Sequence, residues 1–227
     1  LGSFKFDSMH ETRDITDWSW SLGYMLMADG AATWADAIEK MTFNALPGAV
    51  TKDFKQLQYF SLANQLLATN TQCTVWSPSR VSYRAAHETE CCNGNVHRAM
   101  PNFVSRMWMQ TPQGLAATCY GPCEVSARIA GQKVTIVEDT DYPFREAASI
   151  NGTPQESIAG PVGSFVPVAR IFYPGDVVEL RLPMAVRTRD WFGGQALSVE
   201  RGPLVFSVPV PEQALTSFVD PPEIKVI

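Results

Sequence analysis

Two adjacent cysteines stand in the middle of the most informative stretch of the chain, which reads Glu90-Cys91-Cys92-Asn93-Gly94-Asn95-Val96-His97-Arg98. A disulfide between neighbouring cysteines is strained and rare, so both thiols are expected to be free. Two adjacent thiols can bind one soft metal ion, and Zn²⁺ takes Cys, His and carboxylate ligands in a tetrahedral shell. Buried free cysteine is also common as a small hydrophobic residue. The dipeptide alone therefore leaves a metal site and a plain core position both open.

Several side chains elsewhere in the sequence are candidates to complete a metal shell. They are His10, Glu11, His87, Glu88 and Glu90. The tripeptide His-Glu-Thr occurs twice among them, at residues 10–12 and 87–89, but the flanking residues do not match, so it is not a repeat.

The residues outward from these motifs predict helices in the first half of the chain. Asp14–Met27 has apolar residues at helical spacing, and Asp29-Gly30 is expected to end that helix. A second helix is expected from Thr33 to Pro47-Gly48, and a third over about 95–109, with Pro101 at its start or at a kink. Trp20 lies off the apolar stripe of the first helix. Core packing is the default interpretation of this side chain, and stacking on a sugar face is the alternative.

The second half of the chain has the pattern of short strands. Turn residues recur at roughly ten-residue spacing, which favours a β-sandwich over alternating strands and helices. The expected strands are Leu115–Tyr120, Glu124–Ile129, Lys133–Glu138, Ser164–Phe172, Asp176–Leu182, Ala196–Glu200 and Leu204–Val210. We therefore predict an α + β protein with a helical domain at 1–113 and an antiparallel β-sandwich at 114–227.

Composition excludes several classes of protein. The 227 residues are 45% hydrophobic and include 12 Phe, 6 Trp and 6 Tyr, which excludes disorder. A net charge of −5 argues against a nucleic-acid partner, and no apolar run approaches the roughly 18 residues of a membrane span. The start at Leu1 suggests a piece of a longer protein. Localisation stays open between the cytoplasm and export from a bacterial-type cell.

Three ordered motifs resemble a known enzyme family. Residues 90–98 are similar to the Cys-Cys-x-x-Asn-x-x-Arg motif of β-L-arabinofuranosidases, glycoside hydrolase family 127 and relatives such as family 146. Residues 10–15 resemble the family's Glu-Thr-Cys segment, and residues 200–205 its Arg-Gly-Pro-Leu-Val strand. The resemblance implies the C-terminal part of an (α/α)6 barrel followed by an antiparallel β-sandwich.

The resemblance also implies a mechanism and a site. It implies a retaining glycosidase in which Zn²⁺ is bound by Glu11, Cys91 and Cys92, and Cys91 attacks the anomeric carbon of a β-L-arabinofuranoside-like substrate. A separate Glu would be the acid/base. His10, His87 and Trp20 are the candidates for substrate binding.

The chain departs from the family pattern in two ways. Arg13 stands where the family has a third Cys ligand, and a guanidinium cannot bind zinc. Zinc could bind through the remaining ligands, Arg13 could supply the charge instead, or the site could be lost, leaving a non-catalytic carbohydrate-binding or structural remnant. In addition, no Glu precedes Glu11, so Asp7 or a residue before Leu1 is the nearest acid/base candidate.

The helices are also too few for a closed ring. The sequence predicts at most four or five, far fewer than a complete (α/α)6 barrel contains. We expect the missing N-terminal half of the barrel, or another chain, to cover the exposed helix faces. The chain alone is expected to be inactive.

Overall fold

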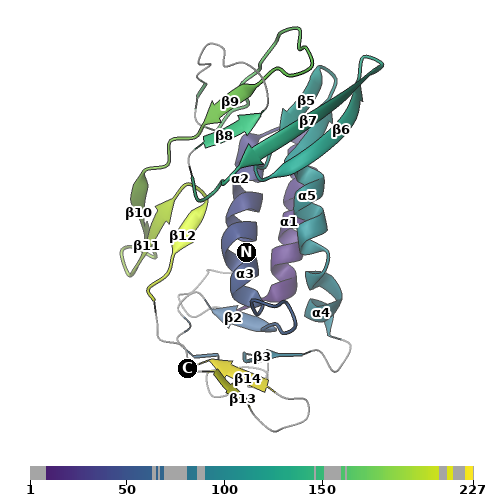
Figure 1. Ribbon diagram of the computed structural model, residues 1–227. Helices are drawn as coiled ribbons and strands as arrows, with labels where there is room; N and C mark the ends of the chain where they lie inside the picture. The colour runs from purple at the N-terminus through teal and green to yellow at the C-terminus, as the bar shows by residue number, and fades with distance from the viewer. Residues whose placement is uncertain are drawn as a thin grey trace.

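The computed structural model describes the backbone of residues 9–62, 65, 67–68, 81–85, 90–145, 147–150, 160–161, 163–209, 214–216 and 223–226. Side chains are described for the same residues except the strands at 147–150, 214–216 and 223–226. Figure 1 shows the long helical segments side by side, with β-strands at both ends of them and along one side. The predicted order, helices first and strands second, is confirmed for most of the described chain.

The first two helices lie close to their predicted positions, whereas the helix expected over about 95–109 spans Ala99–Met107 and is preceded by a separate short helix. The described helices are α1 (Thr12–Asp29), α2 (Ala32–Lys40), the π-helical η1 (Met41–Ala45), α3 (Leu46–Ala49), α4 (Cys91–Val96) and α5 (Ala99–Met107). Gly30 ends α1 in the left-handed conformation, as predicted. Pro47 and Gly48 do not stop the second helix but lie inside α3. Pro47 is in the first turn of α3, where the backbone N–H that proline lacks is not needed for a hydrogen bond within the helix. Pro101 likewise falls in the first turn of α5.

A buried apolar cluster joins α1, α2 and α5. Its members are Leu22, Leu26, Ala35, Ile38, Phe103, Met107 and Cys119. Phe43 of η1 packs edge-on against Phe103, with 5.5 Å between ring centroids. Among the described residues these helices form one packed layer and do not close into a ring.

The strands form small antiparallel sheets. The largest has the order β6 (Cys123–Ile129), β7 (Gln132–Thr140), β8 (Ala147–Ile150), β9 (Val178–Arg181). A second joins β10 (Val186–Trp191), β11 (Ala196–Arg201) and β12 (Leu204–Phe206). The prediction of a strand at Ser164–Phe172 is wrong, because these residues form an extended loop without strand pairing. The arrangement of these sheets as a β-sandwich stays a prediction.

The other described strands form three small sheets. They are β4 (Trp108–Thr111) with β5 (Gly114–Ala117), β1 (Met9–Glu11) with β2 (Phe60–Leu62), and β14 (Glu223–Val226) between β13 (Ala214–Thr216) and β3 (Tyr83–Arg84). The β4–β5 hairpin crosses the predicted division at 113/114, and β3 pairs with a strand from the end of the chain. The division into two domains stays a prediction.

Polar side chains on α2 bind the strands and the loops between them. Glu39 accepts hydrogen bonds from the Tyr120 N–H at 2.7 Å and the Tyr142 hydroxyl at 2.6 Å. Lys40 Nζ lies 2.7 Å from Glu200 Oε1. None of the described helices has the length and apolar character needed to cross a membrane.

Candidate functional site

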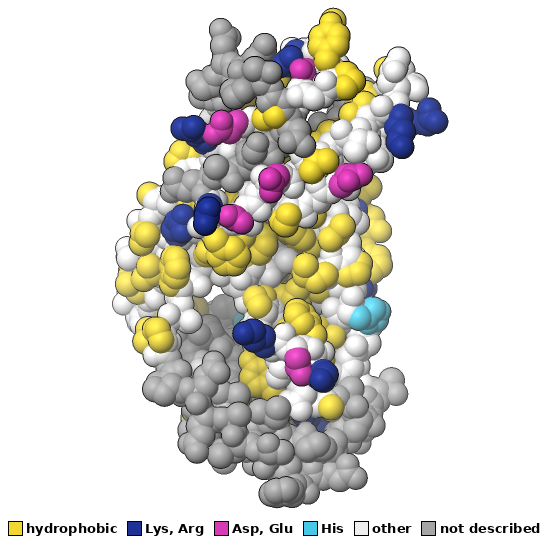
Figure 2. All heavy atoms as spheres, in the orientation of Figure 1, with side chains coloured by type: hydrophobic (Ala, Val, Ile, Leu, Met, Phe, Trp, Pro, Cys, Tyr) yellow, Lys and Arg dark blue, Asp and Glu magenta, His cyan; other side chains and the backbone are white. Residues whose placement is uncertain are grey.

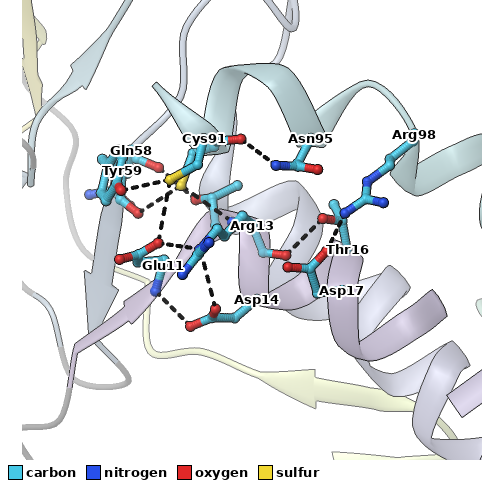
Figure 3. A network of polar contacts seen from close by, with 12 residues as sticks. Glu11, Arg13, Asp14, Thr16, Asp17, Gln58, Tyr59, Cys91, Asn95 and Arg98 are labelled. Carbon is cyan, nitrogen blue, oxygen red and sulfur yellow. Dashed lines mark hydrogen bonds and ion pairs between the residues drawn. The ribbon is translucent and has the colours of Figure 1, made fainter. Parts of the chain in front are cut away.

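The start of α1, the start of α4 and the segment at residues 57–60 meet at one end of the helical layer. The Thr12 N–H donates to the carbonyl of Tyr59 at 2.9 Å, and the Thr12 hydroxyl donates to the carbonyl of Gln58 at 2.5 Å. Thr12 is fully buried, so these bonds are shielded from water. They fix the first turn of α1 next to the segment that carries Tyr59 (Figure 3).

Glu11 is placed by a capping box at the start of α1. Its side chain accepts the N–H of Asp14, and the Asp14 carboxylate accepts the Glu11 N–H at 3.2 Å. Glu11 is the N-cap of this helix. The carboxylate of Glu11 therefore has a defined position at the helix end, 3.6 Å from Cys91 Sγ.

Glu11, Cys91 and Cys92 form a group of potential metal ligands, which we call the Glu–Cys–Cys cluster. One ligand atom from each residue lies within 4.8 Å of the others. Cys91 begins α4, and its carbonyl accepts a hydrogen bond from the Asn95 side chain at 2.6 Å. The structure thus brings together the three residues that the motifs singled out. Figure 3 shows two of them, Glu11 and Cys91, which are 80 residues apart in the chain.

The two thiols have different surroundings. Cys91 is partly exposed, whereas Cys92 is fully buried. Cys92 Sγ accepts the N–H of Arg13 at 3.3 Å and approaches the carbonyl of Tyr59 at 3.7 Å. Burial, followed by the nearby Cys91 and Glu11, raises the pKa of Cys92 to about 12, although the Arg13 N–H opposes that shift. Cys91 is therefore the more accessible of the two thiols.

Tyr59 is a site residue that the sequence did not indicate. Its hydroxyl lies 2.7 Å from Cys91 Sγ. Burial raises the pKa of Tyr59, and the hydrogen bond with Cys91 and the charge of Glu11 add to the rise. Tyr59 lies in an irregular segment with no periodicity or motif, so no local pattern in the sequence points to it.

Arg13 also faces the cluster. Its Nε lies 2.6 Å from Glu11 Oε2 and 4.0 Å from Asp14 Oδ1. The negative charges of Glu11 and then Cys91 raise the pKa of Arg13, although its side chain is nearly half exposed. Arg13 is thus a fixed positive charge on the carboxylate of the cluster (Figure 3).

The other candidate ligands that the structure describes, Glu90 and His10, do not join the cluster. The Glu90 carboxylate forms a buried ion pair with Arg84, so its role in this structure is to hold the segment before α4. His10 is exposed on β1, opposite Ser61. His87 and Glu88 lie outside the described residues, as does the acid/base candidate Asp7.

Trp20, a candidate for substrate binding, lies on α1. Its ring stacks on Tyr24 with 6.3 Å between centroids, and the Arg98 guanidinium lies over it at 4.7 Å. Arg98 also pairs with Asp17 of α1. The position of Trp20 is therefore explained by packing, because Arg98, at the junction of α4 and α5, contacts both its ring and Asp17 of α1.

A shallow pocket of about 340 Å³ lies beside α4, away from the cluster. Its walls include Val50, Phe54, Leu57, Asn93 and His97, and none of the cluster side chains lines it. The pocket is therefore a separate feature and does not give access to Cys91.

The cluster fits only part of a four-ligand zinc site. Its two sulfurs and one carboxylate are ligands that zinc accepts. The fourth ligand implied by the resemblance would come from residue 13, where a guanidinium is already bonded to Glu11. The described residues thus offer three ligands for a metal ion, with a competing cation next to them.

The chain has the fold of part of known glycoside hydrolases. A structure described as a glycoside hydrolase matches with a TM-score of 0.74 and 19% identity over 87% of this chain and 37% of its own. A family 127 β-L-arabinofuranosidase from Geobacillus stearothermophilus T6 matches with a TM-score of 0.67 and 19% identity, over 89% of this chain and 38% of its own. A family 127 β-arabinofuranosidase matches with a TM-score of 0.69 and 15% identity, over 95% of this chain and 46% of its own.

These likenesses confirm, at the level of fold, the resemblance that the sequence motifs indicated. The chain spans less than half of the length of each of these structures. No protein-family model and no curated protein sequence matches the chain.

Proposed function

We propose that this chain is the part of a glycoside hydrolase that carries the nucleophile, acting in the longer protein on β-L-arabinofuranoside-like sugars. The observation that carries the proposal is the meeting of Glu11, Tyr59 and the partly exposed Cys91 at one point, with 2.7 Å from the Tyr59 hydroxyl to Cys91 Sγ. The likeness in fold to family 127 enzymes supports it.

The chemistry we infer is a double displacement with retention. Cys91 Sγ bonds to the anomeric carbon while the bond from that carbon to the leaving oxygen breaks, and water then cleaves the thioglycoside. An acid must protonate the leaving oxygen, and the family resemblance implies a separate Glu for this step. Tyr59 and the Asn95 side chain hold Cys91 in position, the first at the sulfur and the second at the carbonyl.

Zinc is the ion that the resemblance implies, and Glu11, Cys91 and Cys92 are the residues that would hold it. Bound there, it would keep the thiols deprotonated. Because the Arg13 guanidinium is bonded to Glu11, we derive no step of the reaction from the metal.

We also propose that helices outside this chain cover the outer face of α1. Trp20, Tyr24 and Met27 follow one another at spacings of four and three residues on that helix and are 38%, 53% and 57% exposed. We call these three residues the α1 stripe. Since the matching structures are more than twice as long as the part this chain covers, their additional segments are the natural source of such a cover.

Hydrolysis of an aryl β-L-arabinofuranoside by the longer protein tests the proposed activity. We expect turnover, a covalent sugar adduct on Cys91 by mass spectrometry, and loss of both in Cys91→Ser. Cys123→Ser is the matched control, because Cys123 is a free, partly buried thiol bonded to Glu138 away from the cluster. A folded longer protein that binds the sugar without hydrolysing it would instead favour a non-catalytic carbohydrate-binding remnant.

A further inference from the structure

The guanidinium of Arg13 and a metal ion would compete for the same atom. Arg13 Nε lies 2.6 Å from Glu11 Oε2, and this is the oxygen that lies 3.6 Å from Cys91 Sγ. An ion shared by Glu11 and Cys91 would have to sit about 2 Å from that oxygen, on the side that faces the sulfur. Arg13 therefore repels a divalent ion at the position where the ion would bind.

The second sulfur is satisfied without a metal. Cys92 Sγ accepts the backbone N–H of Arg13 at 3.3 Å, and its thiol points to the carbonyl of Tyr59 at 3.7 Å. Cys92 thus has both an acceptor and a donor interaction with backbone groups while being fully buried. No ion is needed to explain why this sulfur lies in the interior.

The first turn of α1 fixes the relation between the two charged side chains. Glu11 is the N-cap, and Arg13 follows two positions later within the same capped turn. A shorter side chain at residue 13 would leave Glu11 Oε2 free toward the sulfurs. A thiol there would add a fourth ligand to the Glu–Cys–Cys cluster.

We propose that Arg13 is the resident cation of the cluster, that it holds the Glu11 carboxylate beside Cys91, and that it keeps divalent metal ions out. Residue 13 then decides whether this site is a metal centre or a metal-free thiol site. The catalytic consequence, hydrolysis that a chelator does not affect, rests on the proposed function. The metal content itself does not.

The test is the zinc content of the purified chain after equilibration with Zn²⁺ and removal of unbound ion, measured by atomic emission. We expect fewer than about 0.1 zinc per chain in the wild type, about one in Arg13→Cys, and loss of that zinc when Cys91→Ser is added. Arg13→Lys is the matched control, because it keeps the positive charge and should stay free of zinc.

Two results would overturn the inference. One is about one zinc per wild-type chain that is lost in Cys91→Ser, because Arg13 would then not exclude the metal. The other is a folded Arg13→Cys chain, checked by circular dichroism, that binds no zinc. If Arg13→Cys does not fold, the comparison of wild type with Cys91→Ser decides alone. Since no substrate enters this measurement, a failure of the proposed glycosidase activity does not affect it.

Discussion

Among the described residues, the hydroxyl of Tyr59 is the group in closest polar contact with the sulfur of Cys91. It lies 2.7 Å from the sulfur, while the backbone carbonyl of the same residue accepts the N–H of Thr12. The ring packs against Phe60 with 4.7 Å between centroids, so its orientation is restrained. When Cys91 is a thiolate, Tyr59 must be the donor of this hydrogen bond, and a donor to a charged acceptor contributes more than a neutral pair.

Replacing Tyr59 by Phe should therefore lower kcat of the proposed hydrolysis by about 10- to 100-fold with little change in KM. The expected loss follows from one hydrogen bond to a charged sulfur, and kinetics of the longer protein on an aryl arabinofuranoside measure it. Tyr83→Phe is the matched control, since the Tyr83 hydroxyl bonds the carbonyl of Gly48 instead. Equal kcat values in wild type and Tyr59→Phe would remove Tyr59 from the site.

At the scale of elements, the segment from α2 to η1 connects the helices to the strands by polar contacts. Asn44 donates to the carbonyl of Pro203 at 2.8 Å and accepts the Val205 N–H at 2.7 Å. Gly202, between them and Glu200, has a φ of 56°, and a Cβ there would lie 2.2 Å from Met184 Sδ. Residues 200–205, which carried part of the family resemblance, therefore dock the β10–β12 sheet onto η1.

Glu39, on the same segment, should make its contact with the loops that carry Tyr120 and Tyr142 dependent on pH. Glu39 is 4% exposed, and burial raises its pKa from 4.5 to about 7. The hydrogen bonds from Tyr142 and Tyr120 lower the pKa and so oppose this rise. Asp36 and Glu138 add to the rise. A raised pKa means that the folded state binds the proton more tightly than the unfolded state does.

The contribution of Glu39 to the free energy of unfolding should consequently be highest below about pH 4.5. This contribution should fall by on the order of 3 kcal/mol as the pH rises through about 7. Glu39→Gln should remove this part of the slope. Urea unfolding followed by tryptophan fluorescence between pH 5 and pH 8 measures the difference between the two chains. Glu124→Gln, an exposed carboxylate on β6, is the control and should leave the slope unchanged. Identical slopes in wild type and Glu39→Gln would show that Glu39 is ionised in the folded state at neutral pH.

At the scale of the whole molecule, local sequence patterns predicted the order of the elements. They did not predict contacts between residues that are far apart in the chain. The apolar stripe and the glycine at residue 30 gave α1 nearly correctly, because helix period and C-cap are local properties. Tyr59 and Asn44 were missed, because their roles depend on partners 32 and 161 residues away. The Cys-Cys motif was found through its resemblance to a family, whereas the part played by Arg13 required its distance to Glu11.

The apolar surface is the other property of the whole molecule that the elements alone do not explain. Figure 2 shows hydrophobic side chains gathered over the region of β10, β11 and β12, where Val186, Leu197 and Phe206 are each about half exposed or more. The α1 stripe adds exposed aromatic and Met side chains on the helical layer. Exposed apolar area of this kind marks surfaces that another segment covers.

The cover proposed for the α1 stripe predicts that one double substitution acts differently in two proteins. Tyr24→Gln with Met27→Gln should change the stability of the 227-residue chain by less than about 0.5 kcal/mol, since both side chains are exposed there. In the longer protein the same pair should cost roughly 3 kcal/mol or more, because the side chains are then buried. Urea unfolding of both proteins measures this. Arg128→Gln with Lys133→Gln, on the exposed β6–β7 hairpin, is the control and should be near neutral in both. An equal effect of the α1 pair in the two proteins would show that the stripe stays exposed in the longer one.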